Sequence, residues 1–329
     1  MSQALEIVNN RRIFKGPLDT YRGITPVKYP WAKELWKIML ANTWFPEEVN
    51  LTSDATDYKN LSGGMRGAYD RSLSFLAHLD SIQLHNLAAN IAPLITSPEV
   101  EQCINRQVFE ENLHVESYST MIEAISADPE DIYFMPLRDS LLQAKNDAVT
   151  AQNRLLEHDK TPGAILLACV SNIILEGIYF YSGFLTFYAL ARTGNMINSS
   201  TMVKFINRDE IVHLHLFAHI TREASREFGI SLVSMKDEIY ELMDASVNLE
   251  VAWGEYVVEG GILGLTPGLI RSYIEYLAND RLGMIGIAPL YSVRPHPVKW
   301  VEEFSAVNKA STAFFERRPT DYQKGVSLW

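Results

Sequence analysis

The feature that most constrains the fold is a long apolar stretch with one charged residue. Residues 164–190 read AILLACVSNIILEGIYFYSGFLTFYAL, and Glu176 is the only charge among them. A helix that is hydrophobic on all sides needs either a membrane or other helices around it. A carboxylate near the middle is costly in lipid, and no other stretch of the chain looks similar. We therefore expect a helix buried inside a large helical protein.

The rest of the chain is predicted to surround that helix with further helices. Apolar residues in 67–94 recur at helical spacing. Other helices are expected at 29–44, 98–127, 130–158, 162–191, 199–227, 231–258 and 267–284, separated by Pro, Gly and Asp, whereas 45–64 is expected to be a connecting loop. Because we find no alternating strand pattern and no Ser/Gly-rich linker, we predict an all-α fold. It has an extended N-terminal arm (1–30), one helical domain (31–313) and a flexible C-terminal tail (314–329).

Charge and cysteine content narrow the environment and the partners. The formal net charge is −11 and the pI is about 5.3, which gives the chain no overall attraction for nucleic acid or anionic lipid. Two cysteines, Cys103 and Cys169, cannot form a disulfide framework, and no CxxC pair is present. The N-terminal residues lack the apolar region of a signal peptide. We predict a cytoplasmic protein with buried thiols.

A repeated spacing of acids and histidines indicates metal chemistry. In each copy, a single carboxylate on an apolar stretch is followed, about thirty residues later, by an ExxH pair. The first copy consists of Asp80, Glu111 and His114, and the second of Glu176, Glu210 and His213. The i, i+3 spacing places the Glu and His of each pair on one helical face. The two copies together offer four carboxylates and two imidazoles.

This residue set is typical of a carboxylate-bridged di-iron or di-manganese site inside a four-helix bundle. Hard oxygen ligands stabilise high oxidation states, and imidazole suits iron and tolerates manganese. A single ExxH pair is a weak motif. An acid on an apolar face, however, is costly unless it is paired or binds a metal. The repetition therefore favours a metal site over a set of solvated acids.

Four further residues narrow the class of protein. Tyr118 lies one turn beyond His114, Trp44 lies in TWFPEEVNLT, Asp209 directly precedes Glu210, and Tyr322 lies in the tail. With HLDSIQ, FEENLHVESYS, LEGIYFYSGF and INRDEIVH in this order, most of the chain resembles the small, radical-generating subunit of class I ribonucleotide reductase. The resemblance implies a ferritin-like helical bundle with a di-metal site in its four-helix core and extra flanking helices.

The resemblance also implies a role for each of these residues. The six acids and histidines of the two copies match the metal ligands, and Tyr118 matches the tyrosine that becomes a stable radical in many members. Trp44, Asp209 and Tyr322 match a radical-transfer route. Phe180, Phe184 and Ile206 match an apolar pocket around the radical site.

The implied function is that of an oxidoreductase, the small subunit of ribonucleoside-diphosphate reductase. A di-metal centre and an oxygen-derived oxidant generate an oxidising equivalent, stored on Tyr118 or on the metal pair. It passes to a large catalytic subunit, which reduces ribonucleotides to deoxyribonucleotides for DNA replication. The resemblance further implies a homodimer that docks to the large subunit through the tail. It leaves open whether the metals are iron, manganese or one of each, whether a flavodoxin-like activator is needed, and whether the substrate is a diphosphate or a triphosphate.

Other functions are weighed against this one. A ferritin-like di-metal oxidase or hydroxylase acting on its own substrate would share the ligands but would not need Trp44, Asp209 or Tyr322. A ferritin-type metal store would be much shorter. A purely structural bundle would bind no metal and would leave Asp80 and Glu176 as uncompensated acids.

Overall fold

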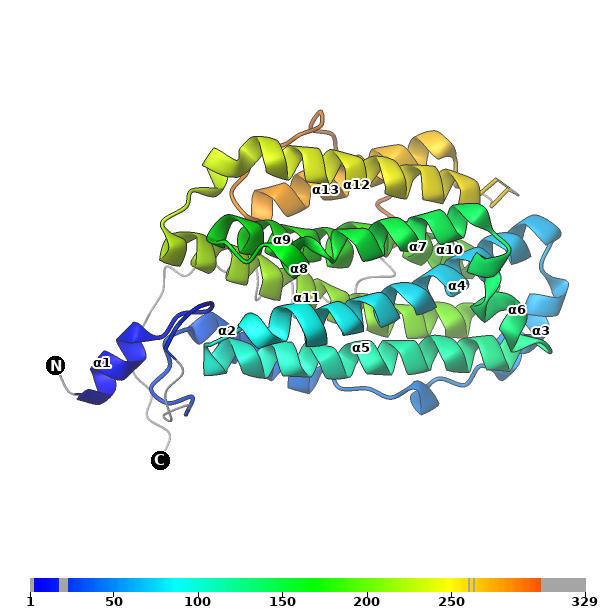
Figure 1. Ribbon diagram of the computed structural model, residues 1–329. Coiled ribbons are helices and arrows are strands. Elements are labelled where there is room, and N and C mark those ends of the chain that lie inside the picture. The colour runs from blue at the N-terminus through cyan, green and yellow to red at the C-terminus, as the bar shows by residue number, and fades with distance from the viewer. Residues whose placement is uncertain (1–2, 18–22, 260, 263, 303–329) are drawn as a thin grey trace.

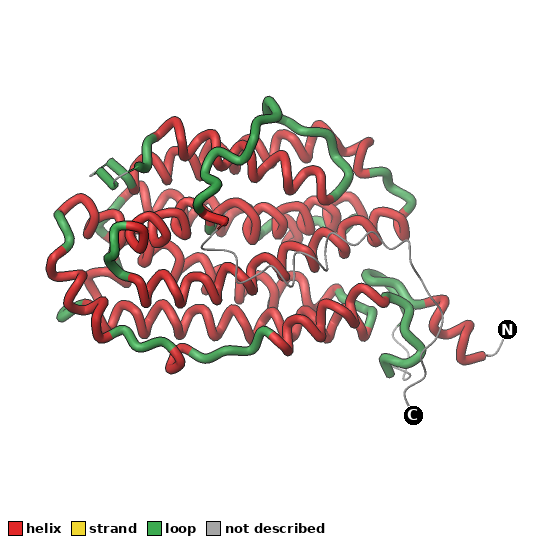
Figure 2. Tube along the Cα trace, turned by 180° about the vertical axis from the view of Figure 1, so that it is seen from behind, coloured by secondary structure: helices red, strands yellow, loops and turns green. Residues whose placement is uncertain are grey.

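The protein is a layered bundle of long helices. The computed structural model describes residues 3–17, 23–259, 261–262 and 264–302, and Figure 1 shows the helices running side by side. The main ones are α2 (Pro30–Ala41), α4 (Gly63–Asn86), α5 (Pro98–Ile125), α9 (Pro162–Ile174), α10 (Tyr181–Arg192), α11 (Ile197–Phe228), α12 (Lys236–Val257) and α13 (Pro267–Met284). In these residues the only β-type pairing is an isolated bridge between Phe14 and Ile95, so the view from behind shows helices and loops alone (Figure 2). The all-α prediction is confirmed.

Four helical segments form the centre of the bundle, namely α4, α5, α11 and the continuous segment that contains α9 and α10. Helix α4 packs against α5 and α10, and α11 packs against α9 and α10. Helix α2 packs against α5 and α11, and the pair α12 and α13 covers α9 and α10 along one side (Figure 1). The centre of the bundle is therefore enclosed by protein on several sides.

The starts of the helices follow from local sequence. Three helices begin with a Ser or Thr cap followed by proline, namely Ser97–Pro98, Thr161–Pro162 and Thr266–Pro267. The hydroxyl oxygen of the cap accepts a backbone N–H of the first turn, and proline suits the first helical position because its missing N–H is not needed there. Helix α11 ends at Gly229, whose φ of 67° lies in the left-handed region that glycine adopts most easily.

The apolar stretch forms the core of the protein. Within the described residues, Pro162–Arg192 is the one helical segment long and apolar enough to cross a membrane, and 83% of its most apolar window is buried against the rest of the chain. Its neighbours are α4, α11, α12 and α13. It is a core helix and gives no indication of a membrane.

This core helix is interrupted at its one acid. Leu175–Tyr179 form a π turn between α9 and α10, and Glu176 lies inside it. Gly177 allows α13 to approach, because a Cβ at this position would lie 2.9 Å from Arg281 Nε. The same Nε donates to the Gly177 carbonyl oxygen at 3.3 Å. Such turns are frequent at functional sites.

A buried ion pair supports the helix on the far side of the π turn. Lys145 of α7 (Ser140–Gln152) donates through Nζ to Glu250 Oε2 of α12. Glu250 Oε1 accepts the backbone N–H of Ser182 at 3.1 Å, directly after the π turn. Burial lowers the pKa of Lys145 to about 8, and the Phe75 ring centroid lies 3.8 Å from Nζ, where its π face stabilises the cation.

Three local expectations are wrong. The N-terminal arm is not extended throughout, because Gln3–Asn10 form helix α1 with Val8 buried. The expected loop 45–64 contains a 3-10 turn, Pro46–Glu48, and helix α3 (Thr52–Asn60). The expected helix 130–158 is divided into α6 (Pro129–Tyr133), a 3-10 turn at Met135–Leu137, α7 and α8 (Leu155–His158).

The physical reasons are local caps and tertiary contacts. Asp139 caps α7 by accepting the N–H groups of Leu141 and Leu142, each at 3.1 Å, and so begins a new helix. Helix α3 has a poor intrinsic pattern, but its Asp54 accepts the backbone N–H of Ser199 at 2.6 Å, in the first turn of α11. Residues 303–329, which hold the end of the predicted domain and the tail with Tyr322, lie outside the described residues.

Candidate metal centre

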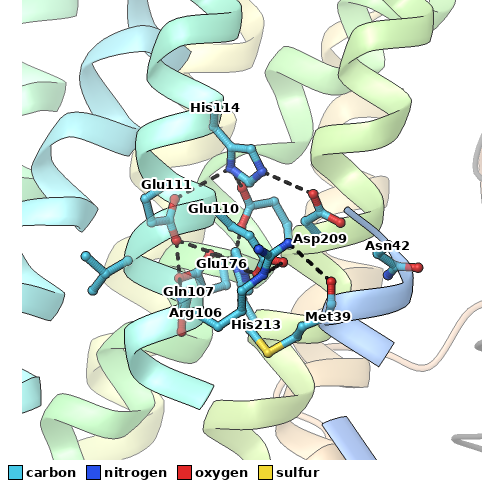
Figure 3. Close-up of polar contacts among 12 residues, drawn as sticks. Met39, Asn42, Arg106, Gln107, Glu110, Glu111, His114, Glu176, Asp209 and His213 are labelled. Atoms are coloured by element: carbon cyan, nitrogen blue, oxygen red, sulfur yellow. Dashed lines mark hydrogen bonds and ion pairs between the residues drawn. The ribbon is translucent and has the colours of Figure 1, made fainter. Parts of the chain in front are cut away.

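Six predicted ligands come together from four helical segments. Asp80 lies on α4, Glu111 and His114 on α5, Glu176 in the π turn, and Glu210 and His213 on α11. Each of them is 0% exposed. Figure 3 shows Glu111, His114, Glu176 and His213 converging between the helices.

The six residues form two overlapping groups. The first group is Asp80, Glu111, His114 and Glu210, and the second is Glu111, Glu176, Glu210 and His213. Within each group the ligand atoms lie within 4.8 Å of one another. Glu111 and Glu210 belong to both groups, so each carboxylate lies where it can bridge two cations. Three carboxylates and one imidazole at each position suit iron or manganese.

Both histidines direct the same ring nitrogen toward the acids. His114 Nδ1 lies 2.9 Å from Glu210 Oε1 and 3.6 Å from Glu111 Oε2. His213 Nδ1 lies 2.9 Å from Glu210 Oε2 and 3.3 Å from Glu111 Oε1. Nδ1 is therefore the atom that each imidazole offers to a cation, while Nε2 points away from the centre.

On the outer side, His114 meets two residues that were predicted to act with it. His114 Nε2 lies 3.5 Å from Asp209 Oδ2, and the same oxygen accepts a hydrogen bond from Trp44 Nε1 at 2.7 Å. The ring centroids of Trp44 and His114 are 6.4 Å apart. A carboxylate on the outer nitrogen fixes the orientation of a metal-binding imidazole. The structure thus joins Trp44, Asp209 and His114 in one continuous contact.

Sequence reasoning missed the equivalent residue on the other histidine. Glu110 Oε2 lies 2.9 Å from His213 Nε2, and Glu110 is 1% exposed. The sequence does contain a signal for it, because Glu110 directly precedes Glu111 just as Asp209 directly precedes Glu210. The repeat is therefore acid–Glu–x–x–His, one residue longer than the ExxH pair.

Neutral amides surround Glu176 and were also missed. Gln107 Nε2 donates to Glu176 Oε1 at 2.6 Å and to Glu111 Oε1 at 3.2 Å. Gln83 Nε2 donates to the same Glu176 oxygen and to Asn172 Oδ1 at 3.1 Å. These amides donate to one oxygen of Glu176 and one of Glu111 without adding charge to the centre.

Several carboxylate oxygens of the ligand groups are left without hydrogen bonds. Among the described residues, neither oxygen of Asp80 has a hydrogen-bond partner, nor does Glu111 Oε2 or Glu176 Oε2. Unpaired buried polar atoms are costly and rare. Two divalent cations bound to these oxygens would remove the cost, so the residues present fit a di-metal group.

When no metal is bound, burial and crowding favour the protonated forms of Asp80 and Glu176. Burial and then the Glu210 carboxylate raise the pKa of Asp80 well above its ordinary value and that of Glu176 to about 8. Burial alone would lower the pKa of His114 and His213. The Glu210 carboxylate and the hydrogen bonds to neighbouring carboxylates together outweigh this effect, and both pKa values are raised well above the ordinary value. Metal binding would displace these protons.

The residues predicted around the radical site are buried. Tyr118 is 0% exposed, and its hydroxyl has no hydrogen-bond partner among the described residues. Burial, and then the charge of Asp80, raise the pKa of Tyr118, so the phenol keeps its proton. Phe180, Phe184 and Ile206 are likewise buried, and the first two rings stack with centroids 5.5 Å apart. That these three residues enclose Tyr118 stays a prediction.

Comparisons with known proteins agree with this arrangement. The family model described as "Ribonucleotide reductase, small chain" matches residues 23–297. The ribonucleoside-diphosphate reductase subunit beta of Treponema pallidum is 37% identical over 327 residues, covering 98% of this chain and 93% of the relative.

Solved structures give the same result. The ribonucleotide reductase R2 subunit from Clostridium botulinum superimposes with a TM-score of 0.85 at 38% identity, covering 90% of this chain and 94% of the other. The dimanganese(II)-NrdF of Streptococcus sanguinis has a TM-score of 0.71 at 21% identity, covering 86% of this chain and 98% of the other. The second likeness concerns the fold alone.

Proposed function

Because the chain belongs to the small-chain family of ribonucleotide reductase and is a beta subunit of the class I type, we propose that its buried acids and histidines hold the di-metal centre of a ribonucleoside-diphosphate reductase. In this proposal the centre generates and stores an oxidising equivalent. A large catalytic subunit then uses the equivalent to reduce ribonucleotides.

The observation that carries the proposal is the contact of Trp44, Asp209 and His114 beside the two overlapping ligand groups. A centre that only stored metal would need no oxidisable ring hydrogen-bonded to the carboxylate behind a ligand histidine. The indole of Trp44 is 2% exposed, so the surrounding protein shields it from solvent. This arrangement suits one-electron transfer from Trp44 toward the centre.

The proposed metal positions follow the two groups. Asp80, Glu111, His114 and Glu210 would hold one metal, and Glu111, Glu176, Glu210 and His213 the other. Bound there as two irons, two manganese ions or one of each, the metals supply the one-electron oxidation that side chains do not perform unaided.

The chain's own residues contribute orientation, exclusion of water and control of protons. Glu111 and Glu210 keep the two positions close together, and full burial excludes water from both. Asp209 accepts the outer N–H of His114, which leaves Nδ1 free to face the metal. Tyr118 holds its phenolic proton at Oη in buried surroundings. We infer that either Tyr118 or the metal pair stores the equivalent.

Interactions with other proteins are also part of the proposal. Beta subunits of this class work with a large subunit, and we propose that residues 314–329 dock to it, with Tyr322 passing on the oxidising equivalent. We further propose a homodimer in the cytoplasm, with a flavodoxin-like activator required if manganese is the physiological metal.

The test is reconstitution of the metal-free chain with iron or with manganese, followed by exposure to oxygen, metal analysis, electron paramagnetic resonance (EPR) and turnover with the large subunit. We expect two metals per chain and deoxyribonucleotide formation that requires both subunits. Trp44→Phe should keep both metals and the radical or metal signal but lose turnover. Failure to bind metal, or full turnover by Trp44→Phe, would refute the proposal. Oxidation of a separate substrate without the large subunit would favour the oxidase alternative.

A further inference from the structure

Each metal-facing histidine is backed by a carboxylate that is itself held by an arginine. Behind His213, Glu110 Oε1 lies 2.9 Å from Arg106 Nε while Glu110 Oε2 lies 2.9 Å from the imidazole. Behind His114, Asp209 Oδ1 lies 3.4 Å from Arg208 Nε. In both cases the carboxylate uses one oxygen for the histidine and the other for the arginine.

Both arginines hold the same short segment of the chain, residues 39–43, at the end of α2. Arg106 Nη2 donates to the Met39 carbonyl at 3.3 Å and to Thr43 Oγ1 at 2.9 Å. Arg208 Nη2 donates to the Asn42 carbonyl. The last carbonyls of a helix have no partner within the helix, and basic side chains satisfy them well. Figure 3 shows Arg106 reaching from Glu110 toward Met39.

We call these two sets of contacts the Asp209 arm and the Glu110 arm, after the carboxylate in each. They differ in one respect that bears on their roles. The Asp209 arm includes the indole of Trp44. Glu110 contacts His213 and Arg106. Within the described residues it has no hydrogen bond to a tryptophan or tyrosine. The Glu110 arm can therefore orient an imidazole and balance charge, but it offers no ring to oxidise.

We propose that Glu110 is the positioning residue for the second metal position, the one formed by Glu111, Glu176, Glu210 and His213. Its carboxylate accepts the Nε2–H of His213, which selects the tautomer with Nδ1 free and turns Nδ1 toward Glu210 and Glu111. Arg106 anchors Glu110 and ties this arm to α2. The inference rests on the proposed di-metal function and deepens it, since it assigns to one acid the occupancy of one of the two positions.

Three variants separate positioning from general stability. Glu110→Ala removes the acceptor. Glu110→Gln keeps the size and an amide oxygen that can accept Nε2–H, but it loses the charge and the ion pair with Arg106. Glu123→Gln, on the exposed side of the same helix, is the matched control. Outer partners of metal ligands commonly change metal affinity about 10- to 100-fold, and we expect a loss in that range for the second position of Glu110→Ala. Glu110→Gln should lose less, and Glu123→Gln should match the parent.

The experiment is a Mn²⁺ titration of the full-length, metal-free chain, in which EPR distinguishes free ions, single bound ions and coupled pairs. The parent and Glu123→Gln should bind two ions per chain as a coupled pair. Glu110→Ala should fill one position at parental affinity and give the signal of a single bound ion, with partial recovery of the coupled pair in Glu110→Gln. If Glu110→Ala fails to fold, Glu110→Gln alone must still show weaker binding at one position only.

The outcomes that overturn the inference are distinct from those that overturn the function. A parent that binds no Mn²⁺ would refute the di-metal centre and, with it, the role of Glu110. A parent that binds two ions while Glu110→Ala also binds two at the same affinity would refute the role of Glu110 alone. Equal weakening of both positions would show a general structural effect and would also refute it.

Discussion

Replacing Glu176 by glutamine should stabilise the metal-free protein at neutral pH. Glu176 is fully buried, and its pKa is about 8 in the folded chain against an ordinary value of 4.5, because burial and then the Glu210 carboxylate oppose its ionisation. Glutamine has nearly the same shape. Its amide oxygen can still accept the hydrogen bond that Gln107 donates to Glu176.

The magnitude follows from the difference between the folded and unfolded pKa. Below pH 4.5 Glu176 is protonated in both states and costs nothing. As the pH rises toward 8 the unfolded state alone loses the proton, so stability falls, and above 8 the cost is constant. Each pH unit in this window corresponds to about 1.4 kcal/mol, which gives a cost of about 3 kcal/mol at neutral pH. Because Glu176 interacts with neighbouring acids, part of this cost belongs to the group as a whole. We therefore expect the free energy of unfolding of the variant to exceed that of the parent by about 2–3 kcal/mol at neutral pH.

The assay is urea unfolding of the chelator-treated chain, followed by circular dichroism, at an acidic and at a mildly alkaline pH. The gain in the free energy of unfolding should be small at the acidic pH and large at the alkaline one, and Glu123→Gln should show no gain at either. With Mn²⁺ added the order should reverse, because only the parent keeps all its ligands and is stabilised by binding. A variant that is no more stable than the parent at alkaline pH would refute the reasoning.

Two further changes test other parts of the structure. Tyr118→Phe should leave two metals bound and abolish turnover together with any tyrosyl EPR signal; full turnover would assign the stored oxidant to the metal pair. Glu250→Ala should lower the free energy of unfolding by about 3–5 kcal/mol, because Lys145 is left buried without its partner. Urea unfolding checks this against Glu241→Ala, an exposed position on the same helix, and a loss no larger than that of the control would contradict the supporting role of the ion pair.

The sequence predicted the parts that depend on periodicity. Long apolar stripes fix the faces of helices such as α4 and α11, and the i, i+3 spacing of Glu111 and His114 fixes that pair on one face. The isolation of Glu176 in apolar surroundings was enough to mark it as a buried acid. The structure then brings all six predicted ligands into two groups, although their binding of metal stays a prediction.

The parts that were not predicted depend on tertiary contacts or on a change of helix type. Periodicity does not reveal the π turn, since Leu175–Tyr179 are apolar apart from Glu176 and would bury equally well in a regular helix. Helix α3 is held by the bond from Asp54 to α11 rather than by its own propensity. Glu110 was missed because only the packing of α5 against α11 shows which histidine it faces.

The π turn also makes the centre sensitive to chain length. A regular α-helix turns by about 100° per residue, so the wider turn at Leu175–Tyr179 sets the angle between the face of α9 and the face of α10. Loss of one residue there would restore a uniform helix, and the residues of the turn itself would take up new directions. Glu176 would then turn away from Glu210. A deletion of one residue in this turn would therefore change the direction of Glu176, which no single substitution would do.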